Sequence, residues 1–266
     1  MTDTSARRPE PLDPAAVLRW YVAMGVDLAI GEAPLDRTAL PPPAPTPAPP
    51  AAPPQRRAFA APPPAPAAPA AMPADFAAAT DLDDLRARLE AFEGCALRKM
   101  ATRTVFGDGP ADARLMVIGE APGADEDRSG VPFVGRAGKL LDKMLASAGW
   151  PRGAVFITNV VPWRPPGNRN PTPEEVTLCK PFVLRAIELI APEALLLLGG
   201  SAAGAILDRH DGITRLRGRW QSLATAVGEI PVMPTFHPAF LLRSPASKAL
   251  AWRDLLALKA RIGTAE

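Results

Sequence analysis

The fold is decided by residues 115–127, LMVIGEAPGADED. The four apolar residues 115–118 predict a buried strand, and the turn after them carries the carboxyl group of Glu120. Residues 130–135, GVPFVG, then add the aromatic side chain of Phe133. Open α/β sheets bind their ligands at the carboxyl ends of the strands. We therefore expect a pocket where this strand ends.

Outward from this stretch, strand-like and helix-like segments alternate along the chain. Strands are expected at 115–118, 155–161, 194–198 and 230–235, and helices at 136–147, 172–190, 201–207 and 247–262. Such alternation is typical of a parallel sheet covered by helices on both faces. The sequence thus predicts a three-layer α/β/α fold with a central, mainly parallel sheet.

Composition divides the chain into three regions. Residues 1–36 contain apolar residues at helical spacing, which predicts a short amphipathic helical segment that could meet a protein partner. Residues 37–80 are rich in proline and alanine: 15 of the 34 prolines lie between positions 41 and 73, so we expect a disordered linker. Residues 81–266 then form the predicted folded domain.

Charge and cysteine content narrow the class of protein. The formal net charge is +2, but residues 209–266 hold nine Lys or Arg against four Asp or Glu. Such a basic region is suited to bind the phosphates of a nucleic acid. The alternative is that these charges form an ordinary solvated surface. Two cysteines, Cys95 and Cys179, cannot build a disulfide framework. With no signal peptide or membrane-spanning run in the sequence, we expect a cytoplasmic protein without a membrane partner.

Further motifs follow in a fixed order: 119–127, 131–138, 158–161, 164–175 and 236–238. Together they resemble family 4 uracil-DNA glycosylase, from about residue 92 to the C-terminus. The resemblance implies a monofunctional DNA-repair hydrolase that acts on uracil-containing DNA. Such an enzyme flips the base out of the duplex and hydrolyses its N-glycosidic bond, which leaves an abasic site.

The resemblance also implies roles for individual pocket residues. Phe133 would stack beneath uracil, and the Asn159 amide would both donate and accept hydrogen bonds at uracil O4 and N3–H. The backbone N–H of Ala121 and the imidazole of His237 would meet uracil O2, where negative charge gathers as the bond breaks. Glu120 would position or activate water.

Alternatives remain open for several acidic residues and for the histidine. Glu120 could instead cap the turn that follows it, and Glu126 and Asp127 could either contact the substrate or order their loop. A single histidine such as His237 is more often structural, although the motif around it favours a place in the site.

DNA contacts are implied for six residues: Arg164, Asn168, Arg169, Leu241, Leu242 and Arg243. The first three would bind backbone phosphates, with shaping of a turn as the alternative for Asn168. The last three would wedge into the gap left by the flipped nucleotide. Alternatively, the two leucines begin the buried face of a helix.

The chain departs from the family at the iron–sulfur cluster. Members hold a four-iron, four-sulfur cluster on four cysteines, and the matching positions here are Phe92, Cys95, Trp163 and Cys179. Since two of these residues offer no thiolate, we expect no cofactor, with the two rings filling the space and the thiols free. A cluster shared between chains or completed by other ligands is the alternative.

Other functions are weighed against the glycosylase. A non-catalytic DNA-binding or scaffold protein with a relic pocket is the main alternative, and a nucleotide-binding domain is disfavoured because the turn after residue 118 lacks the P-loop lysine. No insertion follows Gly135, so we expect no covalent bond to the sugar, unlike one variant of the superfamily. We expect a monomer.

Overall fold

The computed structural model describes Ala15 and residues 75–265. The predicted helical segment in residues 1–36 and the linker up to residue 74 lie outside this part, apart from Ala15. Among the described residues, no helix has the length and apolar character needed to cross a bilayer.

A five-stranded sheet with the strand order β2-β1-β3-β5-β4 forms the centre of the domain. Its strands are β1 (Leu115–Gly119), β2 (Val155–Asn159), β3 (Ala194–Leu198), β4 (Gln221–Thr225) and β5 (Gly228–Thr235). Four strands are parallel, whereas the edge strand β4 pairs with β5 in the antiparallel direction. The predicted mainly parallel sheet is confirmed, with β4 as an addition. The sequence of β4, QSLAT, is too polar to stand out as a strand.

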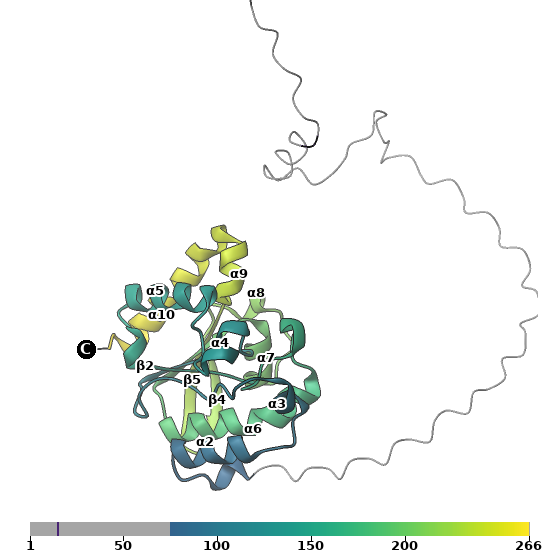
Figure 1. Cartoon of the computed structure of the whole chain (residues 1–266). Coiled ribbons are helices and arrows are strands. Elements are labelled where there is room, and N and C mark those ends of the chain that lie inside the picture. Colours follow the sequence, from purple (N-terminus) through teal and green to yellow (C-terminus); the bar gives the residue numbers. More distant parts are fainter. Residues whose placement is uncertain (1–14, 16–74, 266) are drawn as a thin grey trace, which may run out of the picture. The chain divides into compact units, whose positions relative to one another are not determined.

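Helices cover both faces of this sheet (Figure 1), which confirms the predicted three layers. On β1, Met116 and Ile118 pack into one core cluster, and Leu115 and Val117 into the other, because successive strand residues face opposite sides. The first cluster includes residues of α2 (Leu82–Ala91), α6 (Pro173–Ile190) and α7 (Gly200–Leu207), and the second includes residues of α5 (Arg136–Ala148) and α10 (Lys248–Ile262).

Short helices complete the described domain. They are α3 (Ala96–Met100), α4 (Ala124–Ser129), α8 (Ile213–Leu216) and α9 (Pro238–Arg243), and the 3-10 turns η1 (Phe76–Ala78), η2 (Arg152–Ala154), η3 (Pro166–Asn168) and η4 (Pro245–Ser247). None of these was expected from periodicity, because so few residues carry no helical repeat. Two of them, α4 and α9, flank the pocket described below.

The folded domain begins earlier than residue 81. Phe76 is buried, and its ring lies 5.6 Å from that of Phe92 and 6.2 Å from that of Phe182. The Arg185 guanidinium also donates to the carbonyl of Ala79. Residues 75–80, which the composition assigned to the linker, therefore include side chains and carbonyls that pack against the domain; the alanine- and proline-rich composition around Phe76 concealed these contacts.

Candidate active site

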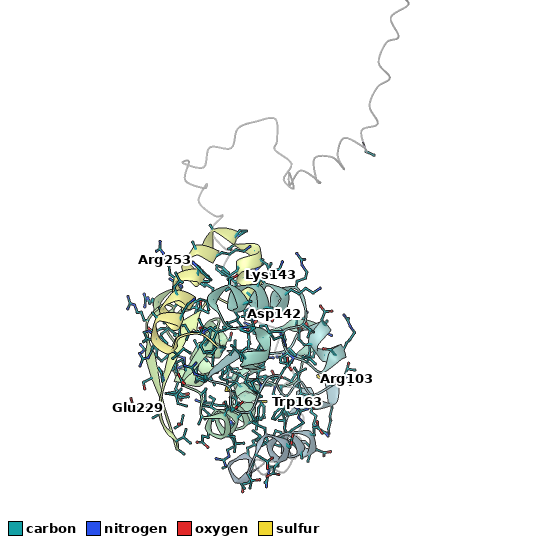
Figure 2. All side chains as sticks on the ribbon, turned by 90° about the vertical axis from the view of Figure 1, so that its left-hand side faces the viewer. Arg103, Asp142, Lys143, Trp163, Glu229 and Arg253 are labelled. Carbon is teal, nitrogen blue, oxygen red and sulfur yellow. The ribbon has the colours of Figure 1, made fainter. Side chains whose placement is uncertain are left out.

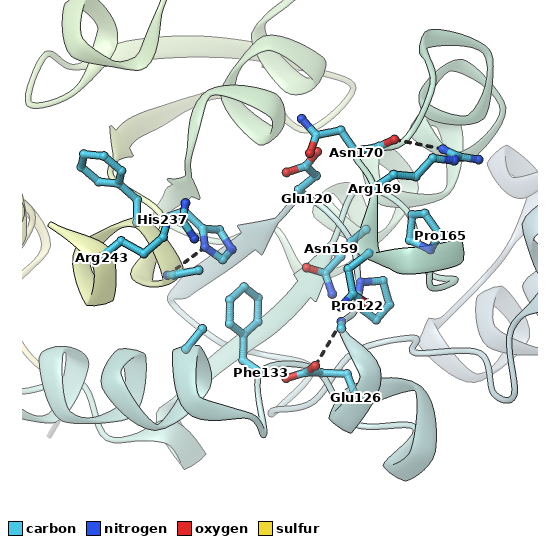
Figure 3. A pocket seen from close by; sticks show the side chains of 16 residues that line it. Glu120, Pro122, Glu126, Phe133, Asn159, Pro165, Arg169, Asn170, His237 and Arg243 are labelled. Atoms are coloured by element: carbon cyan, nitrogen blue, oxygen red, sulfur yellow. Dashed lines mark hydrogen bonds between the residues drawn. The ribbon is translucent and has the colours of Figure 1, made fainter. Parts of the chain in front are cut away.

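A pocket of about 580 Å³ opens where β1 and β2 end. Figure 3 shows Glu120, Phe133, Asn159 and His237 around it. The predicted site residues that line the pocket are Glu120, Ala121, Phe133, Asn159, Asn168, Arg169, His237 and Arg243. The structure thus brings together, around one cavity, the four side chains on which the resemblance depends.

Glu120 is held at the end of β1 by its main chain, because its carbonyl accepts a hydrogen bond of 3.0 Å from Val161 N–H. Burial raises the pKa of the Glu120 carboxyl, and a hydrogen bond with the Ser201 side chain acts against this shift. Within the described residues, its buried Oε1 has no hydrogen-bond partner. A buried polar atom without a partner is costly, so this oxygen is available to a ligand or to water.

Asn159 and Phe133 approach each other above Gly119. Asn159 ends β2 and pairs in register with Gly119, and its buried Oδ1 also has no partner in the described part of the chain. A Cβ at Gly119 would lie 2.4 Å from Asn159 Oδ1 and 2.5 Å from the tip of the Phe133 ring. Only glycine therefore allows the amide and the ring to occupy one side of the pocket.

Glu126 orders the loop that carries Phe133. Its Oε1 accepts hydrogen bonds from Val134 N–H (3.0 Å) and Gly135 N–H (2.9 Å), and its Oε2 accepts one from Gly123 N–H (3.0 Å). These contacts show that Glu126 orders its loop, and Glu126 also lines the pocket. Glu120 was the candidate cap for the turn after β1, but the Gly123 N–H of that turn donates to Glu126 instead.

Asp127 has a structural position as well. It is buried, and its carboxylate accepts hydrogen bonds from the N–H and hydroxyl of Thr102 and from Arg103 N–H. Its two oxygens thus hold the segment before β1, and Asp127 is not among the residues that line the pocket.

His237 caps the amino end of α9. Ala239 N–H donates to His237 Nδ1 over 3.1 Å, so the neutral imidazole carries its proton on Nε2. Burial, together with the positive charge of Arg243 and against the negative charge of Glu126, lowers the pKa of His237 to about 4. The ring centroids of His237 and Phe133 lie 5.7 Å apart, with 35° between the ring planes. At neutral pH the site therefore offers an uncharged N–H donor beside an aromatic face.

The arginines of the predicted phosphate loop are engaged with the protein itself. Arg164 Nε donates to Asn168 Oδ1 over 2.7 Å, and Arg169 binds both carboxylate oxygens of Glu175 at 2.6 and 2.8 Å. Asn168 has φ of +55°, which agrees with its turn-shaping alternative. Asn168 and Arg169 line the pocket, but Arg164 is not among the lining residues.

The three residues of the predicted wedge differ in exposure. Leu241 is fully buried against Phe236 and Ala251, because α9 begins at Pro238 and turns this side chain inward. The alternative of a buried helix face therefore holds for Leu241. Leu242 is 38% exposed, and Arg243 lines the pocket.

Sequence reasoning missed several lining residues, among them Pro165, Asn170 and Phe240. Phe240 precedes the leucine pair, and its ring lies 4.9 Å from that of Phe236. An aromatic residue two positions after the Phe236-His237-Pro238 motif was the only signal for it.

The positions that match the family's cluster ligands form a closed core. The rings of Phe92 and Trp163 stack with centroids 6.3 Å apart and 29° between planes, and both side chains are buried. The buried Cys95 and Cys179 thiols hydrogen-bond each other, which together with burial raises the pKa of Cys179. Two thiols and two aromatic rings do not fit a cluster that needs four thiolates. No group of three or more His, Cys, Asp or Glu that could hold a metal occurs in the described residues.

Comparison with known proteins agrees with this geometry. The family model of the uracil DNA glycosylase superfamily matches residues 106–256. The chain is 42% identical over 165 residues to the type-4 uracil-DNA glycosylase of Thermotoga maritima, which covers 60% of this chain and 83% of that relative. It is also 42% identical to the type-4 enzyme of Archaeoglobus fulgidus (62% of this chain, 84% of the relative) and 38% identical to that of Pyrobaculum aerophilum (66% and 91%).

Proposed function

Because the chain belongs to the uracil-DNA glycosylase superfamily and is similar to its type-4 members, we propose that its pocket binds a flipped uracil and promotes hydrolysis of the N-glycosidic bond. The protein is a uracil-DNA glycosylase that acts in DNA repair. The observation that carries the proposed mechanism is the convergence of Glu120, Phe133, Asn159 and His237 on one cavity.

Recognition of uracil is assigned to Asn159 and Phe133. The unpartnered Asn159 Oδ1 would accept the N3–H of uracil, and the amide N–H of the same side chain would donate to O4. Cytosine offers a bare N3 and an amino group at these places, so the buried oxygen would stay unpaired and the amide would meet a donor. The Phe133 ring supplies the stacking face.

Stabilisation of the leaving base is assigned to His237 and to Ala121 N–H. As the bond breaks, negative charge develops on uracil O2, and a donor fixed in place stabilises it without reorganisation. Because His237 Nδ1 accepts the Ala239 N–H, the proton of His237 is on Nε2, and this N–H can donate to uracil O2. The lowered pKa keeps the imidazole neutral in the ground state.

Glu120 is assigned to the water and to the sugar. Its buried carboxyl would hold the attacking water and offset positive charge on the sugar as the base departs. Burial raises the pKa of Glu120, which strengthens the carboxylate as an acceptor of the water's proton. The products are free uracil and an abasic site, with the DNA strand intact.

We also propose that catalysis and folding need no iron–sulfur cluster in this chain. The proposal is supported by the donor set, since the stacked Phe92 and Trp163 rings occupy two of the four ligand positions. Iron and acid-labile sulfide would be measured on protein purified without oxygen. Stoichiometric iron and sulfide would contradict the proposal.

One assay tests the mechanism. The protein is incubated with chelator and with single-stranded or double-stranded oligonucleotides that contain one uracil, and abasic sites are then cleaved by alkali. We expect scission after alkali and none before it. Glu120→Gln should greatly lower the rate, whereas the control Glu229→Gln, on the exposed β5 end, should not. Absence of alkali-dependent scission on both substrates would favour a non-catalytic scaffold.

A further inference from the structure

Arg152 lies outside the pocket lining but contacts the loop that presents the stacking ring. Its guanidinium donates to the carbonyl of Pro132 over 2.6 Å and to the carbonyl of Phe133 over 3.1 Å. On the other side of the same loop, Glu126 accepts the N–H groups of Val134 and Gly135. A cation and an anion thus bind successive peptide groups before and after Phe133.

The loop needs such support because of its backbone conformation. Phe133 has φ of +54°, in the left-handed region that residues with a side chain rarely adopt. The Phe133 carbonyl also lies against α5, where a Cβ at Gly138 would come within 1.7 Å of its oxygen. A strained conformation persists only where the surroundings over-determine it. The two charged side chains and the close approach of α5 supply those constraints.

Arg152 is itself fixed by two carboxylates. Its Nε donates to Asp108 Oδ2 over 3.0 Å, and its Nη1, which also donates to the Phe133 carbonyl, donates to Asp142 Oδ1 over 3.0 Å; Asp142 lies on α5 (Figure 2). The isolated β-bridge between Asp108 and Ile157 holds the first of these partners against β2. A planar guanidinium can serve these four acceptors at once, whereas a lysine ammonium is a single point charge that cannot span them.

We propose that Arg152 is a positioning residue that fixes the Phe133 ring for stacking on uracil. The inference rests on the stacking role proposed above for Phe133. Arg152 acts through the loop and does not touch the base, so its removal should weaken uracil binding by letting the ring leave its place. Base–aromatic stacking is worth roughly 1–3 kcal/mol per base, which corresponds to about a five- to 150-fold change in binding.

The test measures kcat, KM and inhibition by free uracil for Arg152→Met, Phe133→Ala and the double variant. Arg152→Met should raise KM and the uracil inhibition constant within that range, with a smaller change in kcat, since stacking acts on bound base before and during reaction. Arg152→Lys should give an intermediate value. In the Phe133→Ala background, Arg152→Met should add little, because the ring on which it acts is already gone.

The matched control is Arg114→Met. Arg114 also binds a carboxylate, that of Glu193, and two carbonyls, those of Ile262 and Thr264, but it lies before β1, at the end away from the pocket. An arginine that only stabilises the fold should, when replaced, lower the melting temperature and leave the uracil inhibition constant unchanged. We expect this result for Arg114→Met, whereas Arg152→Met should also weaken uracil inhibition.

The outcomes separate the two proposals. Unchanged uracil inhibition in folded Arg152→Met, with weakened inhibition in Phe133→Ala, would overturn the positioning role alone. The positioning role would also be overturned if the effects of Arg152→Met and Phe133→Ala on uracil inhibition simply added in the double variant. Unchanged inhibition in Phe133→Ala would overturn the stacking role and the inference with it. If Arg152→Met does not fold, Arg152→Lys decides: wild-type uracil inhibition in that variant overturns the inference.

Discussion

Gly119→Ala should damage the pocket while leaving the domain folded. The added Cβ would lie 2.4 Å from Asn159 Oδ1 and 2.5 Å from the Phe133 ring, about 1 Å closer than the 3.4 Å at which ordinary contacts begin. Both side chains must therefore move by most of an ångström. Neither movement is easy, because Asn159 is 1% exposed and the Phe133 loop is hydrogen-bonded on both sides.

The expected magnitudes differ for stability and for activity. Overpacking of this kind costs about 1–3 kcal/mol, which leaves a domain of ordinary stability folded at 25 °C. A misplacement of about 1 Å in an active site can lower the rate about 100-fold. We thus expect kcat/KM on a uracil oligonucleotide to fall by about that factor, with a cooperative melting transition still present.

Gly153→Ala is the matched control, because a Cβ at Gly153 would meet no atom within 4 Å. Its stability should change by no more than about 0.5 kcal/mol, with activity like that of the unchanged protein. Wild-type kcat/KM in Gly119→Ala would refute the assignment of Asn159 and Phe133 to base recognition. Equal losses in Gly119→Ala and Gly153→Ala would show that the effect is not specific to the pocket.

Three further predictions concern His237 and the buried ion pair. His237→Gln should lower kcat about 100- to 1,000-fold, as removal of one anion-stabilising donor does, while the loss of the α9 cap should cost only about 1 kcal/mol of stability; a small loss of kcat would contradict its role at uracil O2. The pKa of His237 is lowered from 6.5 to about 4, so the unfolded chain binds more protons between these values. The stability from the neutral imidazole is then complete above pH 6.5 and is lost as the pH falls toward 4, and urea titrations should show a weaker loss in His237→Gln over this window. Asp254→Ala should destabilise the domain by about 3–5 kcal/mol in thermal unfolding, because it removes a buried carboxylate and leaves both the partly buried Arg217 guanidinium and Thr235 Oγ1 without it; a loss below about 1 kcal/mol would contradict this account.

The sequence alone determined the layers of the fold and the main residues of the pocket. Apolar runs gave the strands β1, β2, β3 and β5, and parallel strands end at the same edge of a sheet. Residues that follow such strands, such as Glu120 and His237, are therefore expected at one edge of the sheet, and the family resemblance assigned them to one pocket. The pairing of Asn159 with Gly119, in contrast, depends on the strand order and register, which the structure shows.

Only the tertiary structure decided which side chains point inward and which charged groups pair. Leu241 and Leu242 look alike in the sequence, but the packing of α9 buries the first and leaves the second partly exposed. Arg152 lies 19 residues from the Phe133 carbonyl that it binds, and no local pattern connects them. Periodicity reports the neighbours within a turn or a strand, whereas burial and ion pairing depend on segments that meet only when the chain folds.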